Sequence, residues 1–124
     1  MRQARRLVVT VCPRERGVVV LPVERGGSAA RLDATAVLAA LRALVAGRGL
    51  DGRVAVRDGC AGGCFAAGPN VDVRIYAASR PDERPDHVAV GSKTYVYSLG
   101  ALPSLADVID EHLPARRRAR RAGR

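Results

Sequence analysis

The chain has 124 residues, of which 48% are hydrophobic and 3% aromatic. That is the length of one domain, and the apolar content is sufficient for a core. No apolar run approaches a membrane span, and none follows the basic start that is long enough for a secretory signal, so we expect a cytoplasmic protein without membrane contact. The net charge of +9 resides in nine terminal arginines: Arg2, Arg5, Arg6, Arg116, Arg117, Arg118, Arg120, Arg121 and Arg124.

This distribution of charge argues against a basic nucleic-acid-binding face on the folded body, whose remaining charges balance. We divide the chain into a basic arm at 1–6, one folded domain at 7–113 and an arginine-rich tail at 114–124. The tail has no apolar content beyond alanine, which is typical of disorder. It lacks the interleaved aromatic residues that stack on bases.

Two strands are predicted near the start of the chain. Leu7–Val11 is apolar and rich in β-branched residues, as in a buried strand. Val18–Val23 is a second apolar run, but it contains Pro22, which cannot donate a backbone hydrogen bond. An edge strand or an extended connection is therefore expected there.

A helix is predicted over Asp33–Ala46, where apolar residues recur every three or four positions. Asp33 can cap the first turn by accepting from free backbone N–H groups. Gly47 can take the left-handed conformation that ends the helix. The alternating segment Arg53–Arg57 follows as a short strand.

The second half predicts two more strand regions and a final helix. Val71–Tyr76 alternates with period two after a Gly68-Pro69-Asn70 turn, as in a strand with one wet face. Val88–Val90 and Thr94–Tyr97 follow a polar loop as strand pieces. Ser104–Leu113 carries an apolar stripe, and Ser104 and Asp107 have capping-box spacing.

This order of elements indicates an α/β fold: a mixed sheet of about four strands with two main helices. In such a sheet, the loops that leave the carboxyl ends of parallel strands gather at one edge. Cys12 follows the first strand, and Cys60 and Cys64 follow the next parallel strand in a loop rich in glycine. We therefore expect the three thiols to converge on a metal or iron–sulfur site. Their odd number argues against a closed disulfide framework.

The segment Asp58-Gly59-Cys60-Ala61-Gly62-Gly63-Cys64, followed by Gly68-Pro69-Asn70-Val71, resembles the thioredoxin-like 2Fe-2S ferredoxins. The run Lys93–Gly100 before a final helix is similar to small predicted metal-binding bacterial members of that family. The resemblance implies a thioredoxin-like fold, a homodimer and a 2Fe-2S cluster ligated by Cys12, Cys60 and Cys64. The backbone amides of Gly62 and Gly63 would donate to sulfur.

One family feature is missing, because a second cysteine normally follows the first by a few residues. Glu15 stands near that position. The fourth ligand is left open between Glu15, Asp58, His87, solvent and a residue of a partner chain. A single iron or zinc ion is the alternative to the cluster, and zinc is the weaker case because no histidine lies close in sequence to the thiols.

Plainer interpretations stand beside these. Cys12 can be a small buried hydrophobe at a strand end, and Cys60 and Cys64 can be redox thiols or inert. Glu15, His87 and His112 have ordinary surface interpretations. Tyr95 and Tyr97 lie on one face of a strand and are expected to pack.

The sequence carries no hydrolase or transferase motif, so we expect a protein that is not an enzyme. The function favoured is electron transfer to a partner enzyme, with the basic tail steering an acidic redox partner. The alternatives are a metal-binding or scaffold accessory module and a nucleic-acid-associated protein that uses the arginine-rich tail.

Overall fold

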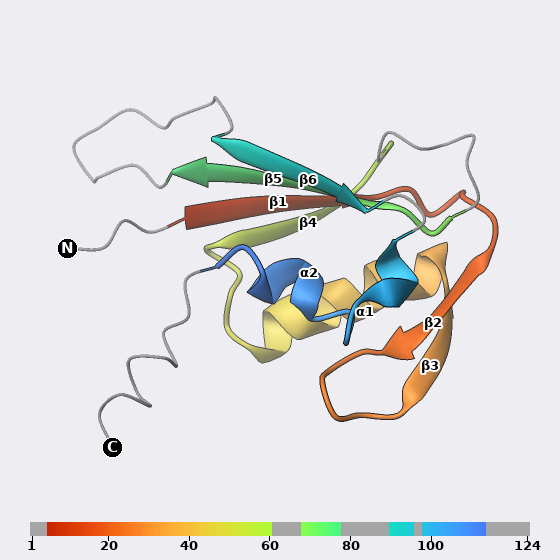
Figure 1. Ribbon diagram of the computed structural model, residues 1–124. Helices are drawn as coiled ribbons and strands as arrows, with labels where there is room; N and C mark the ends of the chain where they lie inside the picture. The colour runs from red at the N-terminus through yellow and green to blue at the C-terminus, as the bar shows by residue number, and fades with distance from the viewer. Residues whose placement is uncertain (1–4, 61–67, 78–89, 96–97, 114–124) are drawn as a thin grey trace, which may run out of the picture.

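The computed structural model describes residues 5–60, 68–77, 90–95 and 98–113. Six strands and two helices are arranged around one core: β1 (Arg5–Val11), β2 (Val18–Pro22), β3 (Ala29–Asp33), α1 (Ala34–Gly47), β4 (Val54–Asp58), β5 (Val71–Ala77), β6 (Gly91–Tyr95) and α2 (Asp107–Asp110), with a 3-10 turn η1 (Leu99–Ala101) before α2. The chain forms two sheets, and the helices lie below the larger one (Figure 1).

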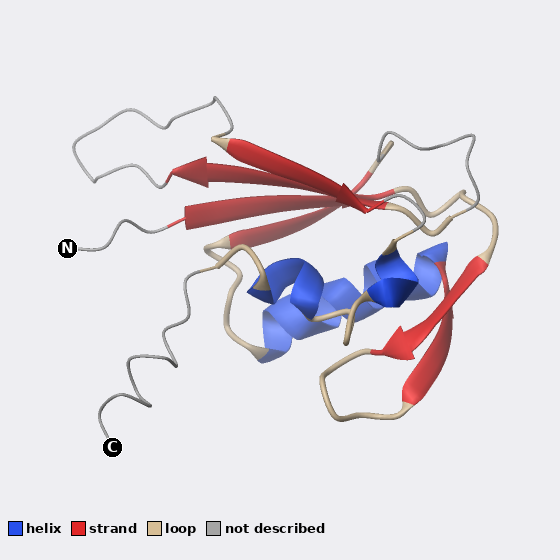
Figure 2. Ribbon diagram, in the orientation of Figure 1, coloured by secondary structure: helices blue, strands red, loops and turns tan. Residues whose placement is uncertain are grey.

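The larger sheet has the order β4-β1-β5-β6. β1 pairs in parallel with β4 and antiparallel with β5, and β5 pairs antiparallel with β6. The smaller sheet is the β2–β3 hairpin, which stands beside the helices (Figure 2). The predicted α/β class, with a mixed four-stranded sheet and two helices, is therefore confirmed.

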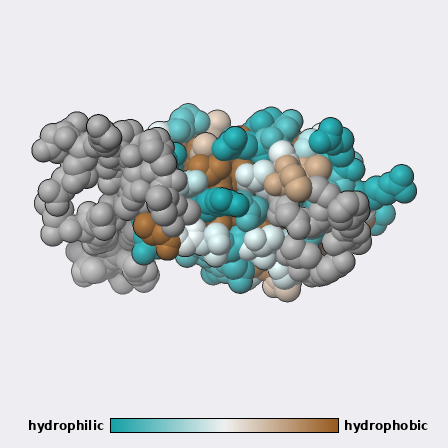
Figure 3. Space-filling view, turned by 90° about the horizontal axis from the view of Figure 1, so that it is seen from above, coloured by the Kyte–Doolittle hydropathy of each residue, from teal (hydrophilic) through white to brown (hydrophobic). Residues whose placement is uncertain are grey.

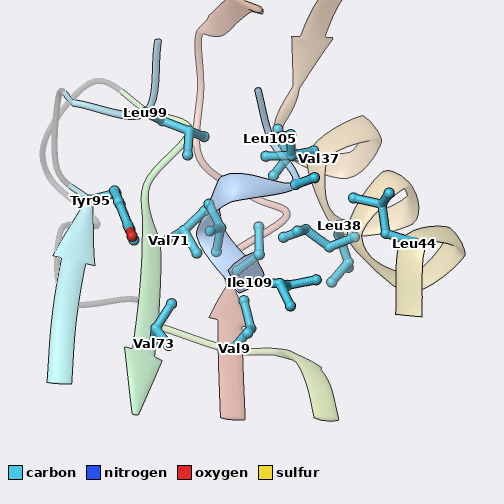
Figure 4. Packing of buried hydrophobic residues seen from close by; sticks show 14 of the residues in the cluster. Val9, Val37, Leu38, Leu44, Val71, Val73, Tyr95, Leu99, Leu105 and Ile109 are labelled. Atoms are coloured by element: carbon cyan, nitrogen blue, oxygen red, sulfur yellow. The ribbon is translucent and has the colours of Figure 1, made fainter. Parts of the chain in front are cut away.

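Alternation places one face of the larger sheet in the core. In β1 every second residue is buried, beginning at Leu7, and the same periodicity buries Val71 and Val73 in β5. α1 presents its buried stripe to this face, and Leu105, Val108 and Ile109 from the α2 region complete the cluster (Figure 4). The whole core is aliphatic apart from Tyr95 on β6.

The helix α1 begins as predicted, because Asp33 accepts a 2.8 Å hydrogen bond from the Ala36 backbone N–H. The prediction for its end is wrong. Gly47 still belongs to the helix, and the left-handed residue is Gly49, with φ of 67°. The N–H of Gly49 bonds to the carbonyl of Ala46, so the turn that ends the helix comes two residues later than predicted.

Other boundaries also differ from the prediction. The strand Ala29–Asp33 was not predicted. β6 begins at Gly91, before the predicted piece Thr94–Tyr97, and of the predicted piece Val88–Val90 only Val90 is described, as a bend. Residues 78–89 and 96–97, including Tyr97, lie outside the described part. The final helix spans only Asp107–Asp110, and its N-cap, Ala106, makes no side-chain cap bond, so the predicted capping box is wrong. The basic arm at 1–4 and the tail at 114–124 are likewise not described.

Within the described part of the chain, neither helix has the length and apolarity needed to cross a membrane.

Candidate functional site

The two cysteine-bearing segments leave neighbouring parallel strands. β1 and β4 are in register, with Val11 opposite Asp58, and the Gly59 N–H donates to the Val11 carbonyl at 3.0 Å. Cys12 follows Val11, and Cys60 follows Gly59. The strand ends that carry Cys12 and Cys60 therefore meet at one edge of the sheet, although 48 residues separate them.

The two described thiols sit in different environments. Cys12 is buried, with 5% of its surface exposed, whereas Cys60 is exposed. One thiol therefore belongs to the core side of the sheet edge and the other to the surface. Cys64 and the glycines Gly62 and Gly63 lie outside the described residues, so their predicted roles stay predictions.

Glu15 is not the exposed side chain that composition suggests. Only 8% of its surface is exposed, and both of its carboxylate oxygens accept hydrogen bonds from Asn70. The Asn70 backbone N–H donates to Oε1 at 2.9 Å, and the Asn70 side-chain amide donates to Oε2 at 3.2 Å. Asn70 is itself fully buried. We call this pair the Glu15–Asn70 clip.

The clip joins the segment after Cys12 to the segment after Cys64. The two backbones also touch directly, since the Gly68 N–H donates to the Arg16 carbonyl at 3.0 Å. Gly17 has φ of 102°, and a Cβ there would stand 2.5 Å from the Gly68 carbonyl oxygen. Only glycine fits this approach. The bond between Gly68 and Pro69 is cis.

A shallow cavity opens beside Cys60 on the face of the sheet away from the helices. Its volume is about 260 Å³. The floor is formed by Val8 and Thr10 of β1, and the remaining lining comes from β4, β5 and the turn after β4: Arg57, Asp58, Gly59, Cys60, Asp72, Arg74 and Tyr76. We call this cavity the trough. Asp58, one of the open choices for a fourth ligand, is an exposed residue of its lining.

Of the two histidines, one lies outside the described residues and the other lies away from this edge of the sheet. His87 falls in 78–89, which the structure does not describe. His112 is half-buried at the end of α2, where its Nε2 lies 3.0 Å from the Tyr95 hydroxyl. Burial lowers the pKa of His112, and burial together with the hydrogen bond to Glu111 raises the pKa of Tyr95 well above its ordinary value. The ordinary surface interpretation of His112 is therefore incomplete.

No group of three or more His, Cys, Asp or Glu side chains is arranged to hold a metal ion within residues 5–60, 68–77, 90–95 and 98–113. The described residues bring together two cysteine-bearing strand ends, the clip and the trough. Sequence reasoning missed the role of Asn70 and of Gly17, because Asn70 was predicted only as part of the Gly68-Pro69-Asn70 turn.

Comparison of the chain with protein-family models, with curated proteins and with solved structures finds no match.

Proposed function

We propose that this protein is a small ferredoxin-like electron carrier that holds a 2Fe-2S cluster at the edge of its mixed sheet. The observation that carries the proposal is the register of β1 and β4, which brings the Cys12 and Cys60 segments to one place through the 3.0 Å bond from Gly59 to Val11. Cys64 follows Cys60 by four residues and is the third thiolate of the proposal.

The donor set suits iron and sulfide. Thiolates are soft ligands that favour iron–sulfur clusters, zinc and cuprous copper over the hard cations that prefer carboxylates. Cys12, Cys60 and Cys64 supply that chemistry, and the amides of Gly62 and Gly63 are proposed to donate to sulfur and tune the potential. When bound, the cluster supplies one-electron redox chemistry.

Glu15 is the weakest of the fourth-ligand choices, because both of its oxygens already accept from Asn70. The remaining choices are Asp58, His87, solvent or a residue of a partner chain. The clip has a different use: it ties the segment after Cys12 to the residue before β5, and so fixes the far end of the span that contains Cys60 and Cys64. The near end of that span is held by the bond from Gly59 to Val11.

In this proposal, the chain contributes to electron transfer by burying one cysteine ligand and leaving another exposed. Cys12 is covered by the core, which limits water around its sulfur, whereas Cys60 is exposed at the end of the trough. A centre held between them would be shielded from water on the side of Cys12 and open to a partner on the side of Cys60. This asymmetry is what an electron carrier needs to exchange electrons with a partner.

Anaerobic purification of the full chain tests the proposal. We expect equimolar iron and acid-labile sulfide, with visible absorption that dithionite bleaches, and loss of both elements in C12S, C60S and C64S. T35S, which alters an exposed residue at the start of α1, is the matched control and should keep the full complement. A colourless protein that contains zinc would instead identify a metal-binding accessory module, and a chain without bound metal would refute both.

A further inference from the structure

The trough owes its shape to a difference in side-chain length across three neighbouring strands. β1 lies in the middle and presents the short side chains of Val8 and Thr10. Longer side chains rise on both sides, Arg57 from β4 and Arg74 from β5. The depression therefore follows β1 toward its carboxyl end, where the lining passes through Gly59 to Cys60.

The trough lies on the open face of the larger sheet. Figure 3 looks onto this face, where hydrophilic side chains surround a smaller apolar patch. Arg57 is exposed, and 60% of the Arg74 side chain is in contact with solvent. Helices α1 and α2 lie on the opposite face, so no described helix covers the trough (Figure 2).

Its positive charges are only partly neutralised within the described residues. Asp72 is ion-paired with Arg74 at 3.4 Å and accepts a 2.9 Å bond from Thr94. Arg57 has no carboxylate within ion-pair distance in the described part of the chain. Arg6 lies over the Tyr76 ring, 4.9 Å from its centroid, and likewise has no described carboxylate partner. The trough and its rim thus offer guanidinium groups that have no carboxylate partner among the described residues.

We infer that the trough is the docking groove for an acidic segment of the electron-transfer partner, an inference that rests on the proposed function. Carboxylates of such a segment would pair with Arg57 and Arg6, and the segment would end beside Cys60, the exposed thiol of the proposed centre. The planar guanidinium of arginine can bind a carboxylate through two parallel hydrogen bonds, which favours this pairing. The same charges would raise the rate of encounter with an acidic partner.

A protein segment fits this surface better than a nucleic acid. Binding of single strands depends on aromatic rings that stack on successive bases. Among the described residues that line the trough, Tyr76 is the one aromatic residue, and the Arg6 guanidinium already covers its ring. The trough therefore supplies charge without a stacking platform.

The test uses the full chain and two fluorescent probes of equal charge, a tetraglutamate peptide and an oligouridylate, with binding followed by anisotropy. We expect R6Q/R57Q to weaken peptide binding about tenfold, since it removes the two guanidinium groups that would pair with the peptide. R31Q/R42Q carries the same net charge but alters exposed residues on β3 and α1, and it should change binding less than about twofold. D72N removes a negative charge from the trough and should tighten binding.

Two results would overturn the inference. If both double variants weaken the peptide equally, the peptide senses only net charge, including that of the terminal arginines. If the oligouridylate binds more tightly and R6Q/R57Q abolishes its binding, the trough is a nucleic-acid site. Thermal melting of each variant shows that the fold is intact.

The peptide assay requires no cluster, so it fails or succeeds independently of the iron and sulfide measurement. Peptide binding that depends on Arg57 in a protein without iron would leave the docking groove standing and refute the electron carrier. The converse result would leave the carrier standing and refute the groove.

Discussion

Among the described residues, two carboxylates are withdrawn from water, and their main partners differ in charge and exposure. Glu15, beside the cysteine-bearing edge, accepts both of its hydrogen bonds from the neutral and fully buried Asn70. Asp107, at the start of α2, is only 1% exposed but pairs with Arg25, whose side chain is 70% exposed. The donors to Glu15 lie inside the molecule, whereas Asp107 pairs with a guanidinium in water and accepts one longer bond, of 3.4 Å, from the buried Ser104 hydroxyl.

The difference determines what is left behind when each acid is removed. Without Glu15, two buried donors of Asn70 lose the carboxylate oxygens that accept from them, which carries a desolvation penalty. Without Asp107, the Arg25 guanidinium is already largely hydrated and keeps its water, and the buried Ser104 hydroxyl loses one long bond. A buried partner thus makes a carboxylate harder to replace than a charged partner does. Glu15, the acid with the neutral partner, is the one that stabilises the candidate site.

The largest effect is expected from E15A. The loss of the carboxylate that accepts from two buried Asn70 donors predicts a decrease of about 3 kcal/mol in the free energy of unfolding, measured by urea denaturation. E15Q can still accept from one Asn70 donor and should lose about 1 kcal/mol.

The control for Glu15 is E24A, which removes a glutamate whose side chain is 61% exposed and ion-paired with Arg48. Such surface pairs contribute little, so E24A should lie near the wild type. An E15A protein as stable as E24A would show that the clip contributes nothing.

A smaller effect is expected from D107A, about half that of E15A, because water replaces the acid at the exposed guanidinium. Part of the loss is electrostatic and screened by salt, so it should shrink between about 0.1 M and about 1 M sodium chloride. The E15A loss should stay constant over the same range, since its partners are uncharged. Equal salt responses for the two variants would contradict the comparison.

The local elements could be predicted from sequence where periodicity was strong. β1, α1, β4 and β5 were all located to within a few residues by their apolar spacing. β3 was missed because Ala29–Asp33 contains no β-branched residue and leads directly into a helix. It is a strand because it pairs with β2. The sequence of one segment alone does not show which other segment it pairs with.

The site was predictable only in outline, for the same reason. The meeting of the Cys12 and Cys60 segments followed from the rule that parallel strands end at one edge. The bond between Glu15 and Asn70 crosses 55 residues, and the pair of Arg25 with Asp107 crosses 82. The pair of Arg25 with Asp107 explains why the capping-box prediction is wrong, since the Asp107 carboxylate accepts from Arg25.

A third acid, Glu111, sharpens the comparison, because here the carboxylate is exposed and its donor is buried. The hydroxyl of Tyr95 donates to Glu111 Oε1 at 2.5 Å. Y95F removes the donor and leaves the acid to water, so we expect a loss of about 1 kcal/mol in urea denaturation. Y76F is the control, since Tyr76 meets Arg6 through its ring, which phenylalanine retains. A loss of stability in Y95F as large as that in E15A would contradict the rule that the cost depends on whether the group left behind is buried.

The smallest effect concerns His112, whose Nε2 lies 3.0 Å from the same hydroxyl. Burial lowers the pKa of His112, the charges of Lys93 and Arg5 lower it further, and Glu111 opposes them. The unfolded chain therefore binds the proton more readily than the folded one. Stability from neutral His112 is complete above the ordinary value of 6.5 and is lost as the pH falls through the folded pKa.

Titration of the His112 ring signals by NMR should give a midpoint below 6.5 in the wild type. Thermal melting between about pH 7.5 and about pH 5 should fall less steeply in H112Q than in the wild type, because the amide does not titrate. A midpoint at or above 6.5 would mean that Glu111 outweighs burial, and that a charged partner decides the state of this group as it does for Asp107. The histidine thus tests, with the smallest change in stability, whether burial or a neighbouring charge controls a polar group at this end of the fold.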